Sequence, residues 1–232
     1  MRKFDTLTAH FVVTLLWLVL SLYLIFLYAP QEATMGELQR IFYIHASSAW
    51  TAYTAYFIIF LGSVVYLWKR SVWADDLAYS AGEVGFVFCS TLLVTGPIWA
   101  KPAWGIWWTW DARLTLTFVL WLLFGSYLML RGYIANGSRA AVLAAVVGIM
   151  GFTDVPINYM AIRWWRTQHP QPVIAGGEGS GLDPRIFLTF MVSVGAMHCL
   201  FAYLVRLRMR MARTRREINV LRHHFADLAP GE

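Results

Sequence analysis

The sequence predicts an all-α, polytopic membrane protein with six transmembrane helices and both termini in the cytoplasm. Of its 232 residues, 59% are hydrophobic and only 14% are charged, whereas a soluble domain carries about 25% charged residues. Six stretches approach the roughly 20 mainly apolar residues that a membrane-spanning helix needs. Because no internal repeat divides the chain, we expect a single membrane domain over residues 1–232.

The six spans are expected at about 10–28, 44–68, 77–98, 114–131, 140–160 and 185–205. The first span follows Arg2 and Lys3, as a signal peptide would, but its apolar core is longer than the roughly 7–15 residues of a signal core. We therefore expect it to be a retained helix. In the fifth span, Ala140, Ala144 and Gly148 repeat at four-residue spacing, which lets another helix approach closely.

The distribution of lysine and arginine predicts the orientation. With the N-terminus in the cytoplasm, the inside segments hold thirteen of the nineteen basic residues, seven of them in the basic tail 206–232. Cytoplasmic segments of membrane proteins carry such an excess. Without the tail the two sides carry equal numbers of basic residues, so the predicted orientation depends on this last segment. Segments 29–43, 99–113 and 161–184 then face outward, and the long, varied loops on that side are where we expect function.

Five of the twelve tryptophans lie in twelve residues of the second outward segment: Trp99, Trp104, Trp107, Trp108 and Trp110. An interfacial aromatic belt is one interpretation, and it explains isolated tryptophans elsewhere, but this cluster is denser than a belt needs. Pro97, Pro102 and Gly105 argue against a regular helix here. We expect a broken segment that lies along the outer surface and offers its rings to a large, planar, apolar ligand.

Two charged residues close the tryptophan segment. Asp111 stands where the next helix begins, so it either caps that helix or contacts a ligand. Arg113 could hold a carboxylate or a phosphate with its planar guanidinium.

Two of the six histidines lie in outward segments beside aromatic residues: His45 follows Phe42 and Tyr43, and His169 follows Trp164 and Trp165. Two imidazoles on one membrane face, with aromatic residues between them, are candidate axial ligands of a haem iron. His198 lies within the last span, where a hydrogen-bonded histidine is the more common arrangement.

Three motifs together resemble a known family. The stretch "GPIWAKPAWGIWWTWDARLT", residues 96–115, resembles the tryptophan-rich WWD signature of haem-handling membrane proteins. "IFYIHASSAW", residues 41–50, and "WWRTQHP", residues 164–170, look like the two histidine segments that flank it. With six spans, the chain is similar to the CcmC family of the bacterial cytochrome c maturation system. Ala100 and Gln168 depart from residues common in that family, and neither is a proposed ligand.

The resemblance implies a carrier in the bacterial inner membrane that binds haem b as transient cargo at the periplasmic face. By this resemblance His45 and His169 are the axial ligands, the five tryptophans form the aromatic platform, and Asp111 and Arg113 close the signature. It also implies delivery of haem to the chaperone CcmE and assembly with the ATP-binding protein CcmA and the membrane subunits CcmB and CcmD.

Other classes of function have less support. The net charge of +6 comes with no nucleic-acid motif, so we expect a lipid bilayer and protein partners rather than nucleic acid. No GxxxxGK[ST] motif is present, so ATP hydrolysis would come from a separate subunit, and we expect a carrier rather than an enzyme.

Two alternative functions stay open. One is a permease subunit of an ABC transporter for haem or another solute, although Glu83 and Asp154 mark no continuous polar path. The other is a membrane b-type cytochrome.

Overall fold

The computed structural model describes residues 5–134, 137–165, 167–169 and 181–228. In order along the chain the helices are α1 (Thr6–Tyr23), α2 (Ile41–Lys69), α3 (Val72–Trp104), α4 (Ala112–Tyr133), α5 (Gly137–Gly151), α6 (Asp154–Trp164) and α7 (Pro184–Leu228), with a π-helical turn at Leu24–Tyr28 and a 3-10 turn at Glu37–Arg40. Six helical segments in this part of the chain are long and apolar enough to cross a membrane. The expected all-α, six-span class is confirmed.

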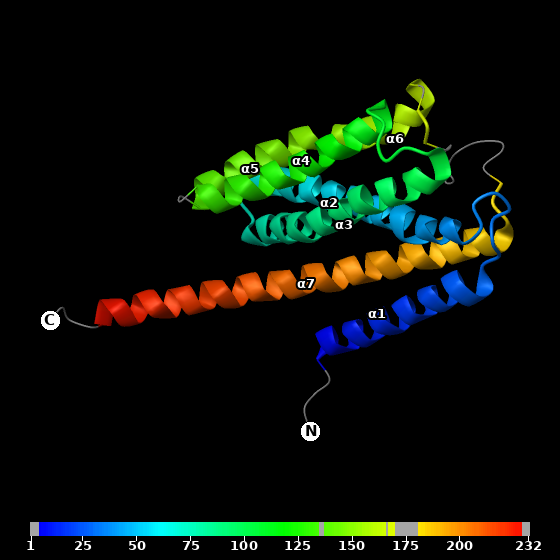
Figure 1. Cartoon of the computed structure of the whole chain (residues 1–232). Coiled ribbons are helices and arrows are strands. Elements are labelled where there is room, and N and C mark those ends of the chain that lie inside the picture. Colours follow the sequence, from blue (N-terminus) through cyan, green and yellow to red (C-terminus); the bar gives the residue numbers. More distant parts are fainter. Residues whose placement is uncertain (1–4, 135–136, 166, 170–180, 229–232) are drawn as a thin grey trace.

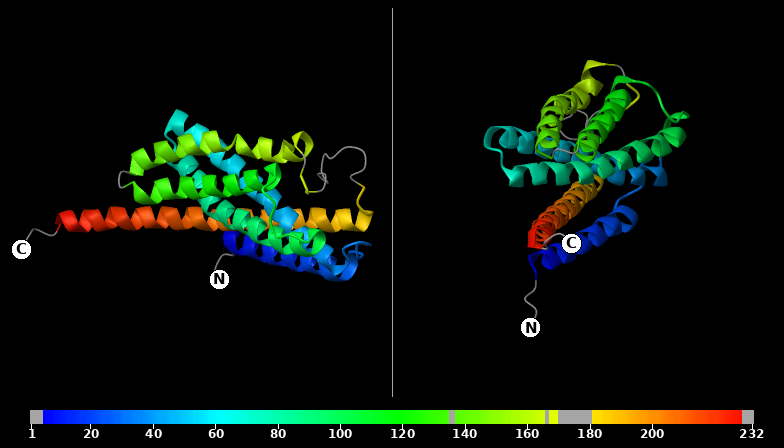
Figure 2. Two further views of the ribbon diagram at one scale, coloured as in Figure 1. Left: turned by 45° about the horizontal axis from the view of Figure 1, so that its top comes forward. Right: turned by 90° about the vertical axis from the view of Figure 1, so that its left-hand side faces the viewer.

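The helices pack in layers (Figure 1). Helices α4, α5 and α6 lie on one side of the α2–α3 pair, and α7 lies on its other side with α1 packed against α7. Figure 2 shows α7 continuing well beyond the other helices. The end of the bundle that holds 105–111 and 167–169 is here called the tryptophan end, and the opposite end, where α1 begins and α7 finishes, the arginine end. Which end faces the cytoplasm stays a prediction.

Small residues let the central helices approach closely. A Cβ added to Gly62 of α2 would lie 2.9 Å from the Cβ of Ala78 of α3, and one added to Gly148 would lie 2.7 Å from Ser63 Oγ of α2. Ala140 and Ala144 of α5 are also buried. The close helix approach expected from the Ala140–Ala144–Gly148 repeat is therefore confirmed, with α2 as the partner. In a membrane, close backbone packing of this kind replaces the hydrophobic drive that water supplies elsewhere.

Gly85 offers a test of this packing. A Cβ at this position would lie 2.5 Å from the Cβ of Ala55 and 2.7 Å from Cε1 of Phe124, so Gly85→Ala forces α2 and α4 away from α3. We expect it to lower the free energy of unfolding by about 1–3 kcal/mol, the usual cost of overpacking. Gly132→Ala is the control, because nothing lies within 4 Å of its added Cβ. Thermal denaturation in detergent measures both; equal stability of the two variants would contradict the packing argument.

The fifth span differs from the expected single helix. It consists of α5 and α6, separated by a turn at Phe152 and Thr153. Asp154 begins α6 and is buried, with no hydrogen-bond partner for Oδ2 in the described structure. Its position at a helix start, where the backbone N–H groups favour a carboxyl group, explains how the span accommodates the residue.

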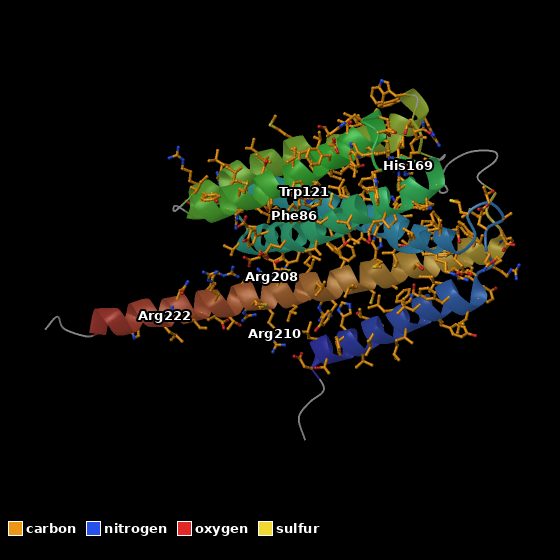
Figure 3. The ribbon with its side chains drawn as sticks, viewed as in Figure 1. Phe86, Trp121, His169, Arg208, Arg210 and Arg222 are labelled. Carbon is orange, nitrogen blue, oxygen red and sulfur yellow. The ribbon has the colours of Figure 1, made fainter. Side chains whose placement is uncertain are left out.

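Salt bridges join the helices at the arginine end. Arg131 of α4 donates to both carboxylate oxygens of Asp75 of α3, at 2.6 and 2.8 Å. Arg208 of α7, labelled in Figure 3, donates through Nε to Glu83 of α3 at 2.8 Å. The tail expected at 206–232 is helical as far as Leu228, and with 45 residues α7 measures about 67 Å at 1.5 Å per residue, far more than a bilayer core. Because Glu83 is paired with Arg208, it does not mark an open polar path through the bundle.

Candidate functional site

The tryptophan segment begins as a helix, which corrects the expected break at the prolines. Helix α3 continues through Pro97 and Pro102 to Trp104, and Gly105 ends it with a left-handed φ of +80°. Each proline removes one N–H from the helix, a loss that packed neighbours can tolerate in a membrane protein, whereas Gly105 supplies the conformation that stops a helix. Residues 105–111 are irregular, as expected.

A cavity opens beside this segment, between α2, α3, α4, α6 and the start of α7. The empty space, which includes its open mouth, is about 1180 Å³. Six of the nine residues singled out from the sequence line it: His45, His169, Trp99, Trp104, Trp108 and Arg113. Ala100, where the family commonly differs, also lines it. Most of the lining residues are apolar or aromatic, and Arg113 contributes a positive charge.

His45 lies in the first turns of α2 and is buried there. The residue is 9% exposed, and its Nδ1 lies 3.0 Å from the hydroxyl oxygen of Thr95 in α3. Its ring meets Trp99 edge-on, with the ring centroids 5.7 Å apart. Since Nδ1 contacts α3, Nε2 is the nitrogen left for a ligand in the cavity.

His169 lies in the non-helical segment after α6 and is half-buried (Figure 3). Its backbone N–H donates to Thr167 Oγ1 at 3.0 Å. Thr167 in turn donates to Asp111 Oδ2 at 3.0 Å, and the N–H of Gln168 points to the same oxygen at 3.4 Å. The structure therefore brings His45 and His169 to one cavity, although 124 positions separate them in the sequence.

Asp111 does two things at once, where the sequence left a choice between capping and ligand contact. Its Oδ1 accepts from the N–H of Leu114 at 3.0 Å and caps α4. Its Oδ2 accepts from Thr109 at 3.0 Å as well as from the His169 segment. Asp111 does not line the cavity. The carboxylate thus joins the tryptophan segment to the segment that carries His169.

The five tryptophans separate into two groups. Trp99, Trp104 and Trp108 line the cavity, whereas Trp107 and Trp110 do not and are 57% and 74% exposed. Trp110 packs edge-on against Trp108, with centroids 5.6 Å apart. Three rings therefore provide aromatic wall, and two present apolar surface outward, where a bilayer or a partner can meet them.

Arg113 reaches across to the backbone of α6. Its Nη1 donates to the carbonyl of Asn158 at 2.7 Å. The fully buried side chain of Asn158 accepts from Tyr53 at 3.0 Å and donates to Thr117 at 3.2 Å. Tyr53, Thr117 and Arg113 all line the cavity, so this network forms a polar part of its wall and holds the guanidinium there.

The other cations near this end are less suited to the cavity. Lys101 donates to the carbonyl of Gly105 at 2.8 Å and does not line the cavity, nor does the exposed Arg163. Arg166, also a candidate from its position in the sequence, lies outside the described residues. His198 is hydrogen-bonded to Thr54 at 2.9 Å and to the Val194 carbonyl at 2.9 Å, as expected of a histidine inside a span.

Sequence reasoning missed Thr95, Asn158 and Thr167, which contact the candidate ligands without being candidates themselves. A signal existed for Thr95: it lies one helical turn before Trp99, so it shares a face with that residue once α3 is taken to be continuous. For Asn158 and Thr167, only the folded structure shows which residues they contact.

Comparison with known proteins identifies the family of the whole chain. The family model described as "Heme exporter protein C" (CcmC) matches residues 3–224. A heme exporter protein C of Bradyrhizobium diazoefficiens is 32% identical over 193 residues, covering 83% of this chain and 73% of that protein. One from Haemophilus influenzae is 30% identical over 188 residues, covering 79% and 75%. A putative cytochrome c biosynthesis ccmC-like mitochondrial protein of Marchantia polymorpha is 31% identical over 150 residues, covering 65% and 63%. The chain belongs to the heme exporter protein C (CcmC) family.

Proposed function

We propose that this protein is a haem carrier of cytochrome c maturation, which holds haem b at the tryptophan end with His45 and His169 as axial ligands. The supporting observation is that both histidines, three tryptophans and Arg113 line one cavity. Imidazole is a common ligand of haem iron, and the aromatic wall offers the flat apolar surface that a macrocycle needs. The names of the relatives, heme exporter and cytochrome c biosynthesis protein, support the same cargo and process.

The rest of the proposal follows the same lines. The tryptophan end faces the periplasm of a bacterial inner membrane, and haem passes from there to a chaperone of the CcmE type. The protein works with an ATP-binding subunit, CcmA, and with the membrane subunits CcmB and CcmD, and does not itself catalyse a reaction. The cavity lies at the end of the bundle, and His169 lies on a non-helical segment. This arrangement suits a bound haem that must later be released.

The test uses the purified full-length chain in detergent, titrated with haem b. We expect one haem per chain with a six-coordinate, low-spin spectrum, followed by loss of haem to an added soluble CcmE domain. Haem that stays bound in the presence of excess acceptor would favour a resident b-type cytochrome. Haem uptake by vesicles containing only this chain and an ABC subunit, with no binding at the cavity, would favour a permease.

Arg113 is expected to pair with a propionate of haem. We expect Arg113→Gln to weaken binding of ordinary haem by roughly 10- to 150-fold, which corresponds to losing a charge-assisted hydrogen bond of roughly 1.5–3 kcal/mol. Haem whose propionates are esterified should bind the variant and the wild type alike, because it lacks the negative charge. Lys101→Gln is the control, since Lys101 lies on the same end outside the cavity. An equal loss of affinity for both forms of haem would show that Arg113 acts only through Asn158.

A further inference from the structure

One turn of α3 surrounds the imidazole of His45. Thr95 contacts Nδ1, Trp99 packs edge-on against the ring, and Gly96 lies beside Cε1. A Cβ on Gly96 would come within 3.3 Å of Cε1, closer than ordinary van der Waals contact. The ring is therefore packed closely against α3, and among these three residues Thr95 is the one that hydrogen-bonds to it.

The proton of the Thr95 hydroxyl is already used. Thr95 Oγ1 lies 2.7 Å from the carbonyl oxygen of Thr91, one turn earlier in α3, and a carbonyl can only accept a hydrogen bond. This is the usual back-bond of a threonine inside a helix. A hydroxyl has one proton to donate and lone pairs to accept with. Toward His45, at 3.0 Å, Thr95 can therefore act only as the acceptor.

We infer that Thr95 is a positioning residue that sets the tautomer of His45, so that Nδ1 carries the proton and Nε2 presents its lone pair to the cavity. In a neutral imidazole one nitrogen is the donor and the other the acceptor. If Thr95 donated instead, Nε2 would carry the proton and could not bind iron.

This inference rests on the proposed function for its consequence, though not for the tautomer itself. Metal-binding histidines commonly donate their second N–H to an acceptor, which orients the ring and raises the basicity of the ligand. Here the acceptor is a neutral hydroxyl and not a carboxylate. Thr95 thus orders the ligand before haem arrives without adding a negative charge beside the iron.

The first measurement needs no haem. Nitrogen-15 NMR of the full-length chain, labelled at histidine and assigned with His45→Ala, reports which ring nitrogen of His45 is protonated. We expect a protonated Nδ1 in the wild type and in Thr95→Ser, and a larger share of the Nε2–H form in Thr95→Val, which has no acceptor. A wild-type His45 protonated at Nε2 would overturn the inference, whatever the variants do.

The second measurement uses haem. Loss of an outer partner of a metal ligand costs about 10–100-fold in affinity, so we expect Thr95→Val to bind haem in that range more weakly. Its midpoint potential should be more positive, because a less basic imidazole stabilises ferric iron less. Thr95→Ser should stay near the wild type. Thr91→Val is the matched control, because the hydroxyl of the half-buried Thr91 donates to the Val87 carbonyl at 3.0 Å and does not contact His45.

The outcomes separate the inference from the proposed function. Unchanged affinity and potential in Thr95→Val, with an unchanged tautomer, would overturn the role of Thr95. A haem spectrum that does not depend on His45 would refute the proposed ligand, while the NMR result on the haem-free chain would still decide the tautomer.

Discussion

His45→Ala is expected to lose haem, whereas His169→Ala is expected to keep a weaker, five-coordinate, high-spin haem. The two ligands differ in how the chain holds them. His45 is buried on a helix and confined by α3, while His169 is half-buried on a non-helical segment. A ligand on a rigid element needs little ordering when it binds. Loss of a residue that only hydrogen-bonds to a metal ligand weakens metal binding by up to about 100-fold. Because His45 is the proposed ligand itself, we expect His45→Ala to weaken haem binding by more than that.

Optical spectra of the purified variants, titrated with haem, measure this difference. His10→Ala is the control, because His10 lies at the arginine end and contacts Arg206. Added imidazole should restore a six-coordinate spectrum in His169→Ala. If both variants kept the wild-type low-spin spectrum, the two-histidine site would be refuted; if His169→Ala lost haem as completely as His45→Ala, the asymmetry between the ligands would be wrong.

Asp111→Asn is expected to release His169 while leaving α4 capped. Asparagine caps a helix about as well as aspartate, so its remaining oxygen can still accept from Leu114. Its amide nitrogen cannot accept from Thr109, Thr167 or the N–H of Gln168, all of which now point to Oδ2. We expect Asp111→Asn to show the same haem spectrum as His169→Ala, while its stability stays near that of the wild type. Asp111→Ala should show the same spectrum and lose a further ~1 kcal/mol of stability with the cap.

Thermal denaturation and haem titration of these variants separate the two roles. Asp183→Asn is a matched control, since Asp183 accepts from the N–H of Arg185 at 2.8 Å beside the start of α7 and does not contact the His169 segment. A wild-type haem spectrum in Asp111→Asn would mean that the cap alone explains this residue. Loss of all haem with unchanged stability would instead indicate direct contact with the ligand.

The number of spans could be predicted from the sequence, but some of their ends could not. Apolar composition over about twenty residues is a local property, so six spans were expected, and the described residues contain six helical segments long and apolar enough to cross a membrane. The continuation of α3 to Trp104 and the break in the fifth span were missed. Proline and glycine act on local propensity, and packing against neighbouring helices decides whether a proline is tolerated.

The candidate site shows the same division. Residue types and spacing singled out His45, His169 and the tryptophans as candidates, because they lie near the ends of the predicted spans and beside dense aromatic residues. Which tryptophans line the cavity, and how Asp111 reaches the His169 segment, depend on contacts between residues far apart in the chain. No local pattern carries that information.

The sequence by itself thus determined the membrane class, the six expected spans and the set of candidate site residues, since each follows from local composition. Only the tertiary structure decided that Trp107 and Trp110 lie outside the cavity lining, that Asp111 joins two segments, and that Thr95 lies within hydrogen-bond distance of His45 Nδ1. The orientation of a side chain and its hydrogen-bond partners are set when helices that are distant in the sequence pack against each other.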